Sequence, residues 1–493
     1  MTGLDAVDWV VLGVYLLIVG GLGLAASRRV ATAGEMSLAG RSMPAWAVSV
    51  SVLATSLSAV TFIGAPQDAY IGDLTYLSLS IGTVLGAVIV ATVFLPRYYA
   101  AGVTSVYEVV GTTGSVRAQR ACTLVFLAGR MLASGARLYV AAIPCSLIVF
   151  GKLEAGTLLA SIAMLTVVAL LYTSSGGIRA VIWTDVLQAG VFVIAAVVSI
   201  WVLLRAIPLD LGGIAGELTA SENKLRLLDF STDLEKPYTL WSALIGFTLL
   251  SVAAYGTDQD LAQRTLTCRS ARRAAGSLIA ASVVGIGMAG VFLVIGLLLY
   301  VAHRTGAIGG NDAGDTRRVY VDFILSETPA GVRGAMLAGV FAAAMSSLDS
   351  ALNAMSTAAQ AELRHEVTLR QSRLLNIGFG ALLALTAGVF AVSQGGRESG
   401  LIPFALGVMV YAYAGLLGVF VSVLVFRRGS SVSIIGALLG GAAVVAVLQW
   451  GHTWVGVPIR VSLGWRMAAG TLVSFAIAVS GATRAVREAG SDV

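Results

Sequence analysis

Long apolar segments recur along the whole chain of 493 residues. A helix needs about 20 mainly apolar residues to cross the hydrocarbon core of a bilayer. Thirteen segments meet this requirement, at 7–26, 45–72, 75–96, 121–150, 156–173, 182–204, 239–261, 275–302, 332–358, 374–393, 401–426, 432–450 and 464–482. The pattern predicts an all-α polytopic membrane protein with about 13 transmembrane helices.

Polar residues interrupt two of these segments at comparable places. The second, SVSVLATSLSAVTFIGAPQDAYIG, has a polar cluster at its centre, and the seventh, ALIGFTLLSVAAYGTDQDLAQR, becomes polar at Ser251 and again at Gly256–Asp260. With the first segment set aside, the two begin successive groups of five, and the odd number gives those groups opposite orientations. Broken helices at matching places in inverted halves indicate the midplane site of a secondary transporter. Close packing through Gly and Ser is the alternative.

This grouping divides the chain into five parts. They are a leading helix with the first cytoplasmic loop (1–43), a first five-helix repeat (44–206), an extracellular loop (207–238), a second five-helix repeat (239–428, with an extracellular loop at 303–331), and two C-terminal helices with a short cytoplasmic tail (429–493).

Composition agrees with a membrane protein. Hydrophobic residues make up 57% and charged residues 12% of the chain, and the mean hydropathy is +0.88. A soluble protein has about twice that charged fraction. The net charge of +6 is spread through the loops, which favours contact with anionic lipid headgroups and argues against nucleic acid.

Cysteine and histidine indicate neither a disulfide framework nor a metal centre. The three cysteines lack the spacing of metal or redox motifs, and the three histidines lie far apart near helix ends or in loops. The start MTGLDAVDW is acidic, so we expect no cleaved signal peptide.

Lys and Arg concentrate in alternate loops, which predicts the orientation in the plasma (inner) membrane. The N-terminus is expected outside and the C-terminus in the cytoplasm. The inner loops then hold Arg28, Arg29, Arg41, Arg97, Arg117, Arg120, Arg179, Arg264, Arg269, Arg272, Arg273, Arg364, Arg370, Arg373, Arg427, Arg428, Arg484 and Arg487.

The ninth segment carries a polar face in the stretch FAAAMSSLDSALNAMS, residues 341–356. Ala343, Ser346, Ser347 and Ser350 follow the i, i+3, i+4, i+7 pattern of one helix face. Hydroxyls and freed backbone carbonyls of a broken partner helix can together hold a monovalent cation such as Na⁺. A serine stripe satisfied by its own helix carbonyls is the alternative. Asp349 weakens that alternative, because an intramembrane carboxylate is costly and usually functional.

At these residues the chain resembles the sodium:solute symporter family, which includes sodium–sugar, sodium–proline and sodium–sialic acid carriers. The resemblance covers about residues 5 to 430 and rests on LATSLSAVTFIG, FLPRYY, SSGGIRAVIWTDVLQ at 174–188, GTDQDLAQRTL at 256–266 and AAAMSSLDSALN. It implies a leucine-transporter-type five-plus-five inverted repeat with one extra N-terminal helix. It also implies alternating access driven by Na⁺ as the coupling ion, without enzyme activity.

The resemblance implies two cation sites. The main sodium site would use backbone carbonyls of Ala54, Leu57 and Ala343 and the hydroxyls of Ser346 and Ser347. A second sodium site, present in sialic acid carriers, would fall on Asp185, Ser346, Asp349 and Ser350. Asp349 stands where those carriers have serine, which would strengthen a Na⁺ site or make it proton-linked. For Asp185, a helix N-terminal acid stabilised by the helix dipole is the alternative.

The substrate pocket is expected beside the main sodium site. Its candidate residues are Ser56, Ser58, Thr61, Tyr76, Ser80, Ser251, Tyr255 and Tyr411. In galactose carriers a glutamate and a glutamine take the places of Ser80 and Thr61, which argues against a simple hexose.

Two arginines in VFLAGRMLASGARLYV bear on the cargo. The surroundings of Arg130 resemble the place where sialic acid carriers bind the substrate carboxylate, and a guanidinium suits a carboxylate bidentately. The alternative is that Arg130 pairs internally and Arg137 snorkels outward.

The sequence therefore favours a symporter importing a small polar organic solute, best matched by an acidic sugar such as sialic acid or another organic acid. A sodium/neutral sugar or polyol symporter is the alternative. A solute sensor is disfavoured because the tail TRAVREAGSDV offers no signalling module, and an integral membrane enzyme because no catalytic cluster is evident. The expected partners are the small-molecule substrate and the bilayer, with no nucleic acid and no obligatory protein partner.

Overall fold

The computed structural model describes residues 4–27, 32–57, 59–113, 115–221, 223–309, 315–363, 367–393, 401–454 and 461–481, and every regular element within them is helical. Ser58 and the basic residues Arg28, Arg29, Arg364, Arg484 and Arg487 lie outside these ranges.

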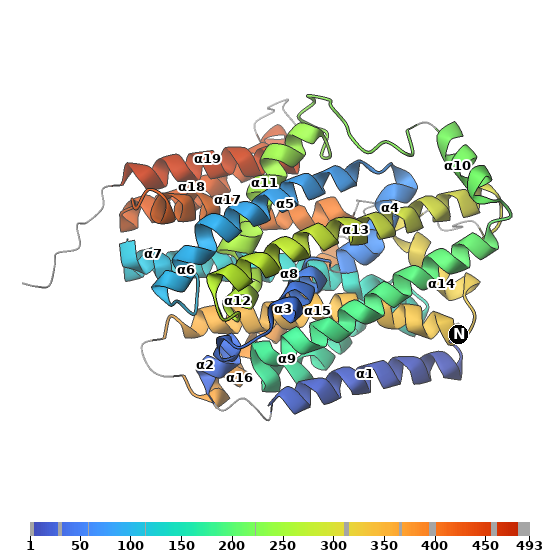
Figure 1. Cartoon of the computed structure of the whole chain (residues 1–493), viewed down its shortest axis with the longest axis horizontal. Helices are drawn as coiled ribbons and strands as arrows, with labels where there is room; N and C mark the ends of the chain where they lie inside the picture. The colour runs from blue at the N-terminus through green and yellow to red at the C-terminus, as the bar shows by residue number, and fades with distance from the viewer. Residues whose placement is uncertain are drawn as a thin grey trace, which may run out of the picture.

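The helices of the first part of the chain are interleaved in the bundle with those of the second part (Figure 1). In order they are α1 (Ala6–Ser27), α2 (Ala33–Leu38), η1 (Ala39–Arg41), α3 (Ala45–Ser56), α4 (Ala59–Ile71), η2 (Thr75–Ser78), α5 (Leu79–Ile89), η3 (Val90–Phe94), α6 (Leu95–Ala101), α7 (Glu108–Thr113), α8 (Val116–Phe150), α9 (Ala155–Ala206) and α10 (Leu211–Ala220).

The second part begins with three short consecutive helical turns. The elements are η4 (Ser242–Phe247), α11 (Thr248–Val252), η5 (Ala253–Thr257), α12 (Gln259–Leu266), α13 (Ala271–Arg304), η6 (Thr316–Arg318), α14 (Val319–Glu327), α15 (Val332–Gln360), α16 (Leu369–Ser393), α17 (Leu401–Leu424), α18 (Ser431–Trp454) and α19 (Leu463–Ser480).

Each of the thirteen predicted spans overlaps helix in the structure. Among the described residues, 10 helices are long and apolar enough to cross a membrane, and the bent pair α3–α4 makes 11. Two shorter apolar helices, Ala155–Leu171 and Ser242–Thr257, match the fifth and seventh predicted spans. The division into two five-helix repeats at 44–206 and 239–428 stays a prediction.

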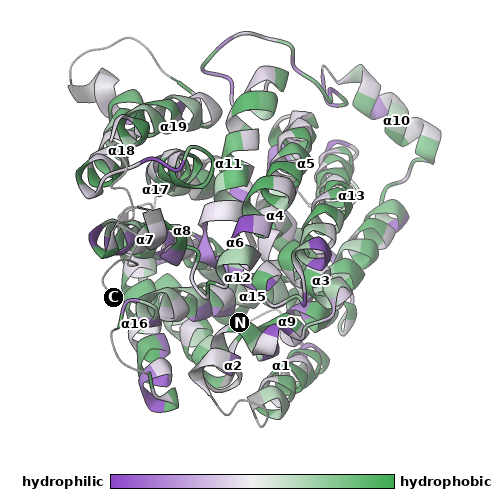
Figure 2. Ribbon diagram, turned by 60° about the vertical axis from the view of Figure 1, so that its left-hand side comes forward, coloured by the Kyte–Doolittle hydropathy of each residue, from purple (hydrophilic) through white to green (hydrophobic). Residues whose placement is uncertain are grey.

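Apolar side chains point outward along the helices at the edge of the bundle. Leu17 on α1, Leu385 on α16 and Leu472 on α19 are all largely exposed, and Figure 2 shows hydrophobic colouring along the outer helices. Such a continuous apolar exterior is expected where lipid rather than water is the solvent. The structure is therefore that of a multi-pass membrane protein.

The long helix α9 contains a sharp break at Gly177, which separates the spans predicted at 156–173 and 182–204. Gly177 has φ 58° and ψ −162°, and a Cβ there would lie 2.6 Å from the carbonyl oxygen of Met36. Only glycine combines this conformation with such close backbone contact. The second arm of α9 consequently starts inside the bundle and carries Asp185.

The centre of the bundle is α15, which is buried along almost all of its length and packs against α9, α8 and α1. Its N-terminus is tied to the leading helix, because Asp8 accepts hydrogen bonds from the backbone N–H groups of Gly331 (2.8 Å) and Gly334 (2.9 Å) and from Arg333 (2.8 Å). An acid at a helix N-terminus satisfies free N–H groups and the helix dipole. The polar face of 341–356 is thereby held in the protein interior.

Candidate functional site

The second predicted span breaks where its polar cluster lies. Helix α3 ends at Ser56, and Leu57 leaves the helical conformation (φ −89°, ψ 80°) while its N–H still donates to the carbonyl of Leu53 at 2.9 Å. The chain resumes in α4 after a bend of 53°. The last carbonyls of a helix have no donor within that helix, so this break offers backbone oxygens inside the membrane region.

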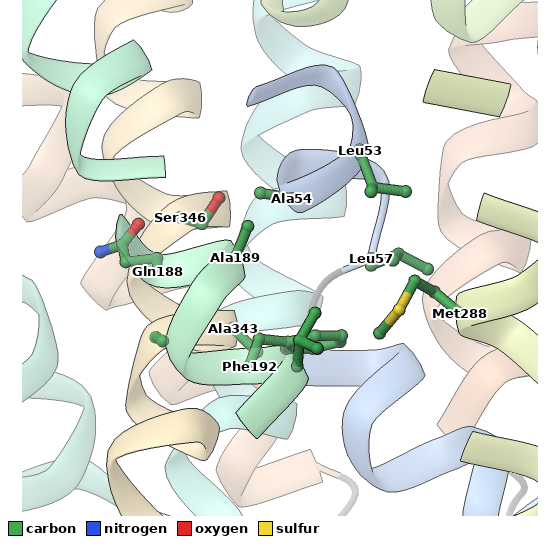
Figure 3. A pocket seen from close by; sticks show the side chains of 11 residues that line it. Leu53, Ala54, Leu57, Gln188, Ala189, Phe192, Met288, Ala343 and Ser346 are labelled. Carbon is green, nitrogen blue, oxygen red and sulfur yellow. The ribbon is translucent and has the colours of Figure 1, made fainter. Parts of the chain in front are cut away.

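A cavity joins this break to α15 and α9. Figure 3 shows Ala54 and Leu57 at the end of α3 facing Ala343 and Ser346 of α15 across it. The second arm of α9 closes a third side with Gln188, Ala189, Phe192 and Val193. The structure thus brings four of the five residues predicted for the main sodium site to one cavity.

The fifth residue, Ser347, lines a smaller neighbouring cavity with Ser134 and Arg137 of α8. Its hydroxyl is buried, and no described residue lies within hydrogen-bond distance of it. A buried hydroxyl without a partner is costly. The larger cavity, which holds the α3 helix end and Ser346, has no charged side chain in its lining, and this fits a monovalent cation held by neutral oxygens.

Gln188 lines the same cavity and was not singled out by the sequence. Its side chain is 1% exposed, and the buried Tyr15 of α1 is a polar neighbour of its amide. It lies one helical turn after Asp185 in the WTDVLQ stretch. An i, i+3 polar pair in an apolar helix was the signal that could have indicated it.

The predicted second site contains one firm contact. Asp185 accepts hydrogen bonds from Ser346 (2.6 Å) and from Ser51 of α3 (2.5 Å). Ser350 instead donates to the carbonyl of Ser347 on its own helix at 3.1 Å, which is the alternative considered for the serine stripe. Asp349 is fully buried. Asp185 and Ser346 therefore meet, and the remaining two residues stay predictions.

The helix α12 brings two buried carboxylates and an arginine against these elements. Asp258 caps the helix by accepting from the N–H of Asp260 at 2.9 Å. Arg264 donates to Asp260 at 2.7 Å and to Asp185 at 3.1 Å. The sequence counted Arg264 as an inner-loop charge, which is wrong: its side chain is fully buried because these two carboxylates compensate its charge.

A second, central cavity lies on the other side of the break, with about 960 Å³ of empty space when the part open to solvent is included. Helices α3, α4, α5, α8, α13 and α17 and the η4–α11–η5 segment contribute to its lining. It collects six of the nine residues predicted for substrate, namely Ser56, Thr61, Tyr76, Ser80, Ser251 and Tyr255. A mainly apolar cavity with several hydroxyl groups in its lining suits a small organic molecule that carries a few polar groups.

Three predicted substrate residues are placed elsewhere or not described. Arg130 forms ion pairs with Asp258 and, at 3.3 Å, with Asp260, and it does not line the central cavity. Tyr411 accepts a hydrogen bond from Trp450 at 2.8 Å, away from the cavity. Ser58 lies outside the described residues. The internal pairing of Arg130 is the alternative that the sequence left open.

Arg137, by contrast, lines the central cavity. It donates to the sulfur of Met409 at 3.5 Å, and no acidic residue of the described chain forms a salt bridge with it. Tyr413, two residues beyond Tyr411, lines the cavity as well and donates to Asp258. An arginine in a membrane interior is expensive unless a charge or polar group compensates it, so this guanidinium is the natural contact for an anion.

Comparison with known proteins gives a consistent result. The model of the sodium:solute symporter family matches residues 37–443. The human sodium/iodide cotransporter is 28% identical over 471 residues, covering 90% of this chain and 70% of that protein. The sodium/sialic acid symporter of Proteus mirabilis (strain HI4320) is 27% identical over 464 residues, covering 89% of both. The substrate-bound outward-open structure of a Na⁺-coupled sialic acid symporter superposes with a TM-score of 0.83 at 22% identity, over 97% of this chain and 99% of that one.

Proposed function

Because the chain belongs to the sodium:solute symporter family, whose members are multi-pass membrane transporters coupled to Na⁺, we propose that it imports a small polar organic solute with an acidic group. Sialic acid or another organic acid is the preferred cargo. The similar proteins named above act on iodide and on sialic acid, and both of these solutes are anions.

The observation that carries this proposal is the position of Arg137. Arg137 belongs to the lining of the central cavity, as do the hydroxyl-bearing residues Ser56, Thr61 and Ser80. A carboxylate can accept bidentate bonds from a guanidinium, and the hydroxyls can bind the remaining polar groups of the solute. A neutral sugar or polyol would leave Arg137 without a counter-charge. This favours the acid over the neutral alternative.

The mechanism follows from where the cation site lies. Ala54 and Leu57 belong to α3, whereas Ala343 and Ser346 belong to α15, so Na⁺ at this cavity holds two elements together. Its binding stabilises the outward-open form and shapes the central cavity, which α3 also lines. The bundle then rocks and both solutes leave inward. Coupling requires Na⁺ to bind the two conformations with different affinity.

The orientation belongs to the same proposal. With the N-terminus outside the plasma (inner) membrane, α2, α6 and α7 lie at the cytoplasmic end of the bundle and α10 at the outer end (Figure 1). Na⁺ then enters down both its gradient and the membrane potential, which contributes about 2.3 kcal/mol per charge for each 100 mV.

Uptake into proteoliposomes tests the proposal. Radiolabelled sialic acid and pyruvate are offered with an inward Na⁺ gradient, with K⁺ replacing Na⁺, and with galactose as the neutral comparison. We expect accumulation of an acid only with the Na⁺ gradient. Equal uptake in K⁺ would refute sodium coupling, and Na⁺-driven accumulation of galactose but of neither acid would favour the neutral-sugar alternative.

A further inference from the structure

The short helix α12 lies inside the bundle and is hydrogen-bonded to several other elements. All its residues are buried. Gln259 donates to the carbonyl of Thr104 at 2.9 Å, and Gln263 donates to the carbonyl of Ser37 at 2.5 Å. Figure 1 shows α12 beside α3, α6 and α15 toward the end of the bundle that carries α2. Helix α12 is thus anchored toward the end of the bundle proposed as cytoplasmic.

The contact that links α12 to the cation sites is made by Arg264. Its Nη2 lies 3.1 Å from Asp185 Oδ2, and its Nε donates to Ser51 at 2.9 Å. Asp185 in turn accepts from Ser346, which lines the main cation cavity. One guanidinium therefore connects α12 to α9 and α3, one hydrogen bond away from the polar face of α15.

The buried carboxylates of this region outnumber its arginines by four to three when Arg137, which lies within electrostatic range of Asp260, is counted. Four carboxylates, those of Asp185, Asp258, Asp260 and Asp349, are at most 1% exposed. Two arginines, Arg130 and Arg264, form ion pairs with the first three of them, and Asp349 lies within electrostatic reach of Arg264. Buried charge of one sign is strongly unfavourable. A small cation that approaches Asp185 is attracted by the carboxylates but repelled by Arg264.

We propose that Arg264 is a built-in substitute for a cation at Asp185, and that Na⁺ and Arg264 compete for this carboxylate. In the cation-free carrier Arg264 neutralises Asp185 and keeps α12 closed, which allows the empty carrier to return to the outward-facing form. When Na⁺ occupies Asp185, Arg264 is displaced, so that α12 is free to move in the inward opening that follows substrate binding. This inference rests on the proposed sodium-coupled function and adds a positioning residue to it.

Substitutions of Arg264 and of its partner Asp260 should change the Na⁺ affinity in opposite directions. Arg264→Gln removes the competitor, so Na⁺ should bind at least about tenfold more tightly, since a unit charge a few ångströms away is worth kilocalories at the effective dielectric of a protein. Asp260→Asn removes the other carboxylate that holds Arg264, so the guanidinium stays on Asp185 and Na⁺ binds several-fold more weakly. A merely structural arginine would lower Na⁺ affinity when lost and would not give this reversal.

The measurement is thermal stability of the purified full chain in detergent as a function of NaCl at constant ionic strength with choline chloride. The Na⁺ concentration that gives half of the full stabilisation reports affinity. The double variant Arg264→Gln, Asp260→Asn removes one charge of each sign and should keep the tighter binding if the single variant folds poorly. Arg318→Gln, which breaks an outer-loop pair with Asp322, is the matched control and should leave the midpoint unchanged.

The rate of Cys268 modification provides a second measurement, which does not require transport. It is fully buried two residues after α12, and its carbonyl accepts from Tyr99 at 2.8 Å. In a Cys122→Ser, Cys145→Ser background, N-ethylmaleimide in Na⁺-free medium should modify Cys268 at least about tenfold faster in Arg264→Gln than in the parent, because α12 is no longer held on Asp185.

The outcomes separate the two proposals. Weaker or unchanged Na⁺ binding in Arg264→Gln and in the double variant, or an unaltered Cys268 rate, would overturn the role of Arg264 while leaving sodium coupling intact. A parent protein that NaCl does not stabilise beyond choline chloride would count against the proposed function itself.

Discussion

The two arginines of α8 should respond to neutralisation in opposite ways. Arg130 forms ion pairs with Asp258 and Asp260. Arg137 instead lines the central cavity, and its one hydrogen bond within the described part of the chain is to the sulfur of Met409. Arg130→Gln leaves two buried carboxylates short of a partner, so stability should fall by about 3–5 kcal/mol. Arg137→Gln removes a costly buried cation, so stability should stay the same or rise.

Substrate binding should show the reverse order. A hydrogen bond to a charged group contributes about 1.5–3 kcal/mol, which corresponds to roughly a 10- to 150-fold change in affinity. Arg137→Gln should raise the KM for an acidic solute by this factor. Arg130→Gln that still folds should change it much less, because Arg130 does not line the cavity.

The assay combines melting in detergent with Na⁺-driven uptake into proteoliposomes at matched amounts of folded protein. Arg137→Lys is the conservative control, since it keeps the charge but loses the bidentate geometry, and should lie between the parent and Arg137→Gln. The reasoning fails if Arg137→Gln leaves the KM for the acid unchanged while Arg130→Gln raises it without loss of stability. That result would restore the substrate role that the sequence assigned to Arg130.

Further predictions follow from other contacts. Ser346→Ala with Ser347→Ala should abolish Na⁺-driven uptake while the protein still inserts, and wild-type Na⁺ dependence in uptake assays would contradict the main cation site. Gly296→Ala should destabilise by about 1–3 kcal/mol in thermal melts, since its Cβ would lie 2.3 Å from the Pro66 carbonyl, whereas Gly290→Ala on the same helix has open space and should be neutral. Asp8→Asn should cost about 1.5–3 kcal/mol by weakening the tie from α1 to α15, measured as faster hydrogen exchange at residues 331–334; unchanged exchange would disprove it. Burial raises the pKa of the Cys268 thiol from 9.0 to about 11, so folding favours the protonated thiol. The stability that this shift contributes is complete below pH 9 and is lost as the pH rises through 11. The rate of Cys268 alkylation in the closed form should therefore keep rising to about pH 11 instead of levelling near pH 9.

Much of the fold follows from the sequence because hydropathy reports directly on lipid contact. The broken second span was visible as LATSLSA, and the structure ends α3 at Ser56. The polar face of 341–356 likewise predicted which side of α15 meets α3 and α9. In both cases a local pattern encodes the answer, since an apolar helix has no reason to carry polar residues except at a site.

Such local patterns do not predict which hydrogen-bond or ion-pair partner an individual polar side chain has in the folded protein. Arg130 and Arg137 share one face of α8 but are two turns, about 10 Å, apart along its axis. Arg130 therefore lies at the height of α12, and Arg137 lies at the height of the central cavity. Which residue meets which feature depends on how the neighbouring helices are placed along α8. Tyr411 and Tyr413 differ by two residues, which puts them on different sides of α17. Arg264 looked like a loop charge because its compensating Asp185 is 79 residues away in the chain.

The cation cavity is lined by residues of both α3 and α15, and this has a thermodynamic consequence. Neither the segment ending at Leu57 nor the one containing Ala343 holds enough oxygens to replace a hydration shell alone, so the separation of the two determines how strongly the ion is held. The Na⁺ affinity therefore depends on the conformation of the protein. A difference in Na⁺ concentration across the bilayer can then drive the conformational change without a separate mechanical element.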